Sequence, residues 1–85
     1  MDICVIKSKL KEWEGETFYT KSNIPFAYQF TSETTIHIIG RKPYNISILD
    51  FEKAIEIKPK RPSQISNLVR GSSYVFGIIT DKRFM

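Results

Sequence analysis

The chain has 85 residues, a formal net charge of +4, 41% hydrophobic residues and 26% charged residues. A chain of this length forms one domain that buries about 60–65% of its unfolded surface, and this composition excludes disordered and fibrous proteins. No apolar run approaches the roughly 18–20 residues of a membrane span, and the N-terminus lacks a charged segment followed by an apolar one. We therefore expect a single compact domain over residues 1–85, in the cytoplasm and without a membrane partner.

The basic residues are concentrated in the second half of the chain. Residues 1–40 contain four Lys against five Asp or Glu, whereas residues 41–85 contain nine Lys or Arg against four Asp or Glu. This asymmetry is compatible with a polyanionic partner, and also with charge that only keeps a small protein soluble.

Apolar residues recur at helical spacing near the N-terminus, at Ile3, Ile6, Leu10 and Trp13. Asp2 is a suitable cap for the start of such a helix. The β-rich run over residues 3–6 is also compatible with a strand. The spacing over the whole segment favours a helix within residues 2–14.

Three short β-rich runs follow, over residues 17–20, 26–31 and 34–39. The middle run alternates apolar and smaller or polar residues, which places Phe26, Tyr28 and Phe30 on one face. Short, turn-like connections favour antiparallel pairing, because parallel pairing needs long crossovers. We expect a three-stranded meander, with residues 34–39 as an exposed edge strand.

The segment 48–57 carries the clearest helix signal. Ser47 is a good N-cap, and Phe51 and Ile55 belong to the stripe that we expect to be buried. Pro59 ends the helix, since the residue before a proline disfavours helical geometry.

The last third of the chain is expected to hold two more helices. Ser63 caps the first, which Gly71 closes. Residues 73–80 are compatible with a buried strand or a helix capped by Ser73, and the spacing favours the helix. The predicted fold class is therefore α+β, a small three-stranded antiparallel meander packed against two or three short helices.

The sequence contains few residues that are suitable for catalysis or for binding a metal ion. The chain has one histidine, His37, and one cysteine, Cys4, so it contains no Cys/His cluster. We therefore expect no metal, no cofactor and no catalytic residue. Cys4 lies in an apolar run and is predicted to be a buried small hydrophobe. The enzymatic alternative is a small RNA-cleaving toxin, for which His37, Arg41, Tyr44 and Arg70 are suitable side chains.

Binding to the phosphate backbone of DNA or RNA is the leading functional hypothesis, because Lys and Arg side chains neutralise phosphates. The predicted contacts are Arg41, Lys42, Lys58, Lys60, Arg61 and Arg70. Lys58, Lys60 and Arg61 lie around Pro59 in a stiff loop and are expected to be the principal ones. The alternative is a protein-interaction or homo-oligomeric module. We expect a homo-oligomer in either case, since surplus apolar surface on a small domain is commonly covered by a second copy.

Overall fold

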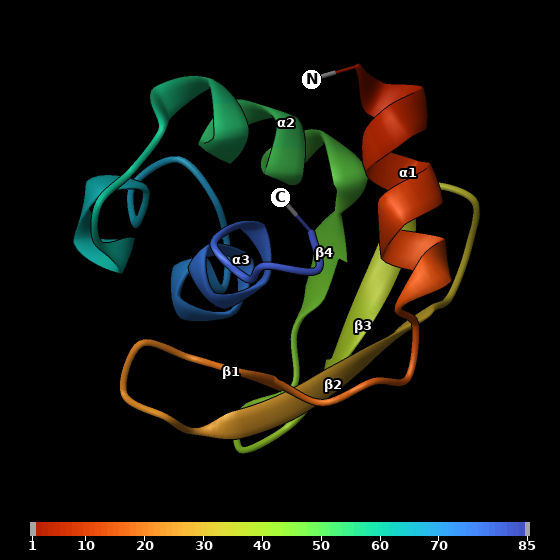
Figure 1. The fold of residues 1–85 in the computed structure, drawn as a ribbon, viewed down its shortest axis with the longest axis horizontal. Helices are drawn as coiled ribbons and strands as arrows, with labels where there is room; N and C mark the ends of the chain where they lie inside the picture. Colours follow the sequence, from red (N-terminus) through yellow and green to blue (C-terminus); the bar gives the residue numbers. More distant parts are fainter. Residues whose placement is uncertain (1, 85) are drawn as a thin grey trace.

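The computed structural model describes residues 2–84, and within them the chain forms three α-helices and a four-stranded antiparallel sheet (Figure 1). In chain order the elements are α1 (Ile3–Glu12), β1 (Phe18–Tyr19), β2 (Pro25–Phe30), β3 (Thr35–Ile39), β4 (Asn45–Ser47), α2 (Ile48–Ile57), a 3-10 helix η1 (Pro62–Gln64) and α3 (Ser72–Ile79). The predicted α+β class is confirmed. No helix in this part of the chain is both long and apolar enough to cross a membrane.

The sheet has four strands rather than the predicted three, in the order β1-β2-β3-β4. The additional strand, β4, has three residues and leads directly into α2. It pairs with β3 in the register Ile36↔Ile46. Since β3 therefore lies between β2 and β4, the prediction that residues 34–39 form an edge strand was wrong.

The N-terminal segment is helical, as predicted. The Asp2 carboxylate accepts a hydrogen bond from the Cys4 amide at 3.4 Å, which caps α1. Leu10 is fully buried, and its carbonyl accepts a hydrogen bond from the hydroxyl of Tyr28 on β2. Burial raises the pKa of the Tyr28 phenol well above its usual range. Cys4 is exposed, so the prediction of a buried cysteine was wrong, because position 4 lies on the side of α1 away from Ile6.

Helix α2 spans the predicted residues and begins at the predicted cap. The Ser47 hydroxyl accepts a hydrogen bond from the Leu49 amide at 3.2 Å. Phe51 and Ala54 are fully buried, whereas Ile55 is only partly buried against the core.

The segment before α3 differs from its predicted form. In place of a helix from Ser63 to Gly71, the chain forms η1 and then consecutive turns. Ile65 and Val69 are both buried, and the Val69 amide donates a hydrogen bond to the Ile65 carbonyl at 3.1 Å. The turns therefore bury two residues four positions apart, which is the spacing that a helix would also produce. Gly71 is not the end of a preceding helix but the N-cap of α3, with φ +65°, and Ser73 is therefore not the cap. The predicted helix over the final segment is confirmed in α3.

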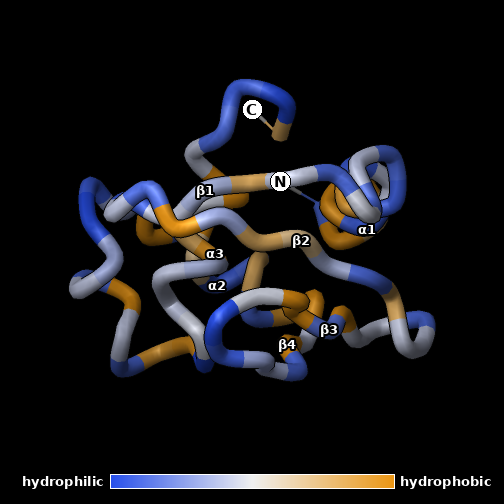
Figure 2. Tube along the Cα trace, turned by 90° about the horizontal axis from the view of Figure 1, so that it is seen from below, coloured by the Kyte–Doolittle hydropathy of each residue, from blue (hydrophilic) through white to orange (hydrophobic). Residues whose placement is uncertain are grey.

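The helices pack on one face of the sheet. That face carries the fully or almost fully buried side chains of Phe26, Tyr28, Ile36, Ile38 and Ile46. The outer turns are largely hydrophilic, although a few hydrophobic stretches also lie at the rim of the trace (Figure 2).

The opposite face of the sheet is not covered by any element in residues 2–84. Gln29, His37 and Asn45 are adjacent across β2, β3 and β4 on this face. Its other members are Tyr19, Pro25, Ala27, Thr35, Ile39 and Ser47. We call this set the open sheet face. None of its residues is Lys, Arg, Asp or Glu, and the formal charge counts His37 as neutral.

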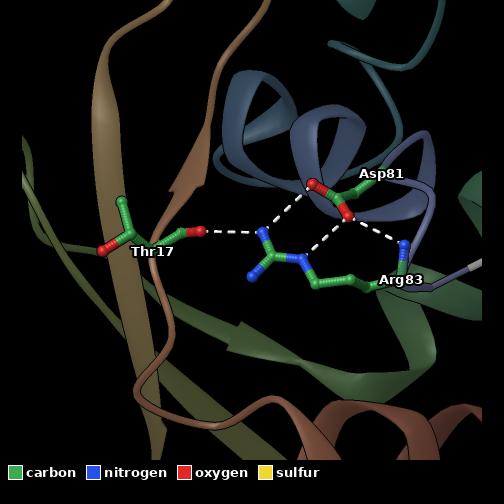
Figure 3. A network of polar contacts seen from close by, with 3 residues as sticks. All are labelled: Thr17, Asp81 and Arg83. Atoms are coloured by element: carbon green, nitrogen blue, oxygen red, sulfur yellow. Dashed lines mark hydrogen bonds and ion pairs between the residues drawn. The ribbon is translucent and has the colours of Figure 1, made fainter.

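An arginine near the C-terminus fixes the last segment to β1 (Figure 3). Arg83 donates to the Asp81 carboxylate from Nε at 3.0 Å and from Nη2 at 3.1 Å. Nη2 also donates to the Thr17 carbonyl at 2.7 Å, and the guanidinium lies 4.0 Å from the centroid of the Phe18 ring. The hydrogen bonds from Arg83 hold the pKa of the Asp81 carboxyl below its usual range.

Candidate functional site

A cleft of about 730 Å³ opens where three connecting segments meet. The first is the turn between β1 and β2, the second joins β3 to β4, and the third runs from η1 into the start of α3. Four cationic side chains line it, namely Lys21, Arg41, Lys42 and Arg70. Each of the three segments contributes at least one of them. We call this feature the basic cleft.

The basic cleft has no acidic residue in its lining. The ion pairs found within residues 2–84 are Lys7 with Glu33 and Arg83 with Asp81, both outside the cleft. The four cations of the cleft therefore have no carboxylate partner among the described residues. Unpaired positive charges around one hollow attract anions, and low-dielectric walls focus their field.

Tyr74 connects two walls of the cleft. Its ring is buried and packs edge-on against Phe26, with 4.9 Å between the ring centroids. Its hydroxyl accepts a hydrogen bond from the Lys42 amide at 3.1 Å. Helix α3 thereby fixes the connection that carries Arg41 and Lys42.

The turn between β1 and β2 has its own internal support. The buried Thr20 accepts a hydrogen bond at its hydroxyl from the Ile24 amide at 3.1 Å, and at its carbonyl from the Asn23 amide at 2.9 Å. Asn23 adopts φ +63°, a left-handed conformation that asparagine tolerates better than most residues. These bonds hold Lys21 at the cleft while its side chain stays exposed.

The start of α3 lies in the third wall. Its N-cap Gly71 has no side chain, so no side-chain oxygen caps the first turn, and Ser72 and Ser73 also line the cleft. The first amides of a helix have no intrahelical acceptor, and the helix dipole favours negative charge there. The helix start therefore adds to the positive potential that the four cations produce.

The structure brings together three of the six predicted contacts. Arg41, Lys42 and Arg70 line the basic cleft. Lys58, Lys60 and Arg61 are exposed in the loop after α2 and are not part of the lining. We call these three the basic loop. Its backbone is held by Gln64, whose side-chain oxygen accepts from the amides of Lys60 and Arg61.

Sequence reasoning missed Lys21, which lies in the half of the chain with more acidic than basic residues. The only local signal was the turn composition around it, Lys21-Ser22-Asn23, which predicts exposure but no neighbours.

The side chains considered for RNA cleavage do not all meet. Arg41, Tyr44 and Arg70 line the cleft, whereas His37 lies on the open sheet face, with its Nδ1 2.8 Å from the Asn45 side-chain oxygen. The lining contains no His, Asp or Glu. Residues 2–84 contain no group of three or more His, Cys, Asp or Glu side chains that is placed to hold a metal ion.

Comparison with protein-family models, with curated proteins and with solved structures finds no match for this chain.

Proposed function

We propose that the protein is a non-enzymatic domain that binds the phosphate backbone of a nucleic acid at the basic cleft. The observation that supports this most directly is the convergence of Lys21, Arg41, Lys42 and Arg70 on one hollow without an acidic residue in its lining. Each cation that neutralises a phosphate releases a condensed counterion, and this release drives the association. Binding of this kind is general in sequence, because phosphate contacts carry no base information. It is also weak and strongly dependent on salt, because the release of counterions drives it.

The cleft is a better phosphate site than the basic loop for a geometric reason. Its cations come from three segments that tertiary contacts hold in place, whereas Lys58, Lys60 and Arg61 are neighbours in sequence on an exposed loop. Pro62 directly follows the loop and lines the cleft. The basic loop is therefore proposed as a secondary contact for a strand that leaves the cleft.

Two triple variants with the same charge change test this proposal. One replaces Arg41, Lys42 and Arg70 by Gln, and the other replaces Lys58, Lys60 and Arg61 by Gln. Binding of labelled single-stranded and duplex oligonucleotides is measured at several salt concentrations. Removing one phosphate-binding cation reduces the slope of log K against log salt by about 0.9 units for duplex DNA and about 0.7 for single strands.

We expect the cleft variant to flatten the slope by about two to three units and the loop variant to flatten it less. Equal effects of the two variants would show that only net charge matters, which would reject the cleft as the site. No binding of the wild-type protein at low salt would reject nucleic-acid binding altogether.

Self-association is a second candidate function, and the open sheet face supports it. This face carries no formal charge in a chain of net charge +4. Tyr19 and Ile39 are 54% and 46% exposed there. Two copies that meet through an uncharged face avoid the repulsion that their basic surfaces would produce. We therefore propose a homodimer that leaves the basic cleft free. A cytoplasmic location is a separate prediction, made from the sequence.

A further inference from the structure

The basic cleft is concave, which binding to phosphates alone does not require. Its volume of about 730 Å³ falls within the range of about 300–1,000 Å³ that is typical of sites for small organic ligands. Cations that contact only a backbone need no hollow between them. The shape of the cleft therefore indicates that it accommodates a further part of the ligand, besides the phosphates.

Part of the lining is apolar and aromatic. Tyr44 and Tyr74 line the cleft together with Ile24, Pro62 and Val69. Tyr74 is buried and its hydroxyl is occupied by the Lys42 amide, whereas Tyr44 is partly exposed. Tyr44 is thus the aromatic residue of the cleft that is available to a ligand.

The ring of Tyr44 is supported from within the protein. Its centroid lies 5.9 Å from that of Tyr74. A Cβ placed on Gly71 would lie 3.5 Å from both Cγ and Cδ2 of Tyr44, so the ring lies beside Gly71, where a side chain at position 71 would touch it. A ring that is fixed in this way loses little further entropy when a flat ligand stacks on it.

We propose that the basic cleft takes an unpaired base of a single-stranded nucleic acid, which stacks on Tyr44 while Arg41, Lys42, Arg70 and Lys21 bind the flanking phosphates. This inference rests on the proposed function and names its substrate class. Single-strand sites combine a positively charged groove with an aromatic platform, and every base has a face that stacks. A duplex keeps its bases stacked inside, so one of them reaches a cleft only after the cost of unpairing and extrusion.

The test compares three oligonucleotides on the wild-type protein at one low salt concentration. They are a single strand, the same strand with abasic sites throughout, and the corresponding duplex. The abasic strand keeps every phosphate and loses every base. We expect the single strand to bind at least about tenfold more tightly than the other two, the size of one base–aromatic stack.

A pair of variants at one position complements this comparison. Tyr44→Leu keeps an apolar side chain and removes the aromatic face, and it is expected to weaken single-strand binding by about tenfold without altering abasic-strand binding. Tyr44→Phe keeps the face and is expected to bind as the wild type does. Circular dichroism verifies that each variant is folded, and the oligonucleotide comparison needs no variant at all.

The outcomes separate the two proposals. Equal binding of the intact strand, the abasic strand and the duplex would overturn the stacking inference and leave phosphate binding in place. The stacking inference is also overturned if Tyr44→Leu and Tyr44→Phe both bind as the wild type does. Absence of binding to all three oligonucleotides would reject the proposed function and this inference with it.

Discussion

Gly77 of α3 lies directly against the backbone of Tyr19 on β1, so closely that a Cβ added to the glycine would be 2.6 Å from the Tyr19 carbonyl oxygen. Real Cβ atoms do not approach an oxygen so closely, and this neighbour is backbone rather than a flexible side chain. Helix α3 therefore packs against β1 only because residue 77 has no side chain. The same helix contributes Tyr74 to the basic cleft, and its N-cap Gly71 also lines the cleft.

Replacing Gly77 by Ala is expected to destabilise the protein by about 1–3 kcal/mol, because the added methyl group forces α3 away from β1. Alanine is a better helix former by about 1 kcal/mol, so helix propensity alone predicts the opposite sign. Urea denaturation measures the change, and Ser8→Ala, at an exposed position of α1, is the control expected to stay within about 0.5 kcal/mol. A Gly77→Ala protein as stable as the wild type would show that the close approach is not there.

The caps of the helices give a second prediction. Ser47→Ala removes the hydroxyl that accepts from the Leu49 amide and is expected to cost about 0.5–2 kcal/mol of stability. Ser63→Ala is the matched comparison, since the sequence pattern predicts a helix cap there and the structure has none. We expect it to change the free energy of unfolding by less than about 0.5 kcal/mol. Equal losses at both positions would contradict the turn structure of residues 62–71.

The contact between Asp81 and Arg83 predicts a dependence on pH. The pKa of Asp81 is lowered in the folded state, first of all by the side-chain hydrogen bond from Arg83. A carboxyl group whose pKa falls on folding adds stability above its unfolded pKa of about 4 and loses it as the pH falls through the folded value. Asp81→Asn should therefore be less stable than the wild type near pH 7, by roughly 1 kcal/mol or less for a pair of this exposure.

Chemical denaturation across the acidic range provides the measurement for Asp81. The difference between wild type and Asp81→Asn should shrink as the pH drops below about 4. Glu12→Gln, which removes an exposed carboxylate with no ion pair in residues 2–84, serves as control. A difference between Asp81→Asn and wild type that stays constant with pH would mean that the carboxylate charge makes no contribution.

The open sheet face predicts the oligomeric state. At micromolar concentration the wild-type protein is expected to sediment as a dimer, and Ile39→Lys, which places a charge on this face, is expected to yield the monomer. Leu49→Lys introduces the same charge at an exposed apolar position of α2 and should leave the dimer intact. Sedimentation of the wild type as a clean 9.9 kDa species would reject self-association.

The helices were predictable where one segment contains both a cap and an amphipathic stripe. Asp2 and Ser47 start α1 and α2 as predicted, and the buried positions Leu10 and Phe51 lie on the expected faces. These features depend on residues within a few positions of one another. The sequence alone therefore contains the information for them.

Features that depend on distant partners were not predictable in this way. Strand β4 has three residues, and only its pairing with β3 makes it a strand. The spacing of Ile65 and Val69 is the same for a helix and for the turns that the chain adopts.

The basic cleft is the clearest case of a feature set by tertiary contacts. Arg41 and Arg70 were candidates because of their charge, but their convergence with Lys21 requires the hydrogen bond from Lys42 to Tyr74 and the turn held by Thr20. Charge along the sequence identifies cations, whereas tertiary contacts decide which of them share a site.

The most direct test of the central claim is a nuclear magnetic resonance titration of the labelled protein with a single-stranded oligonucleotide at low salt. Binding at the basic cleft predicts that the largest amide shifts occur at Ser22, Arg41, Lys42, Ser72 and Ser73, with little change at Gln29 and Thr35 on the open sheet face. Added salt should reverse these shifts, since counterion release drives the binding. Shifts confined to the basic loop or to the open sheet face, or no shifts at all, would contradict the assignment of the cleft as a nucleic-acid site.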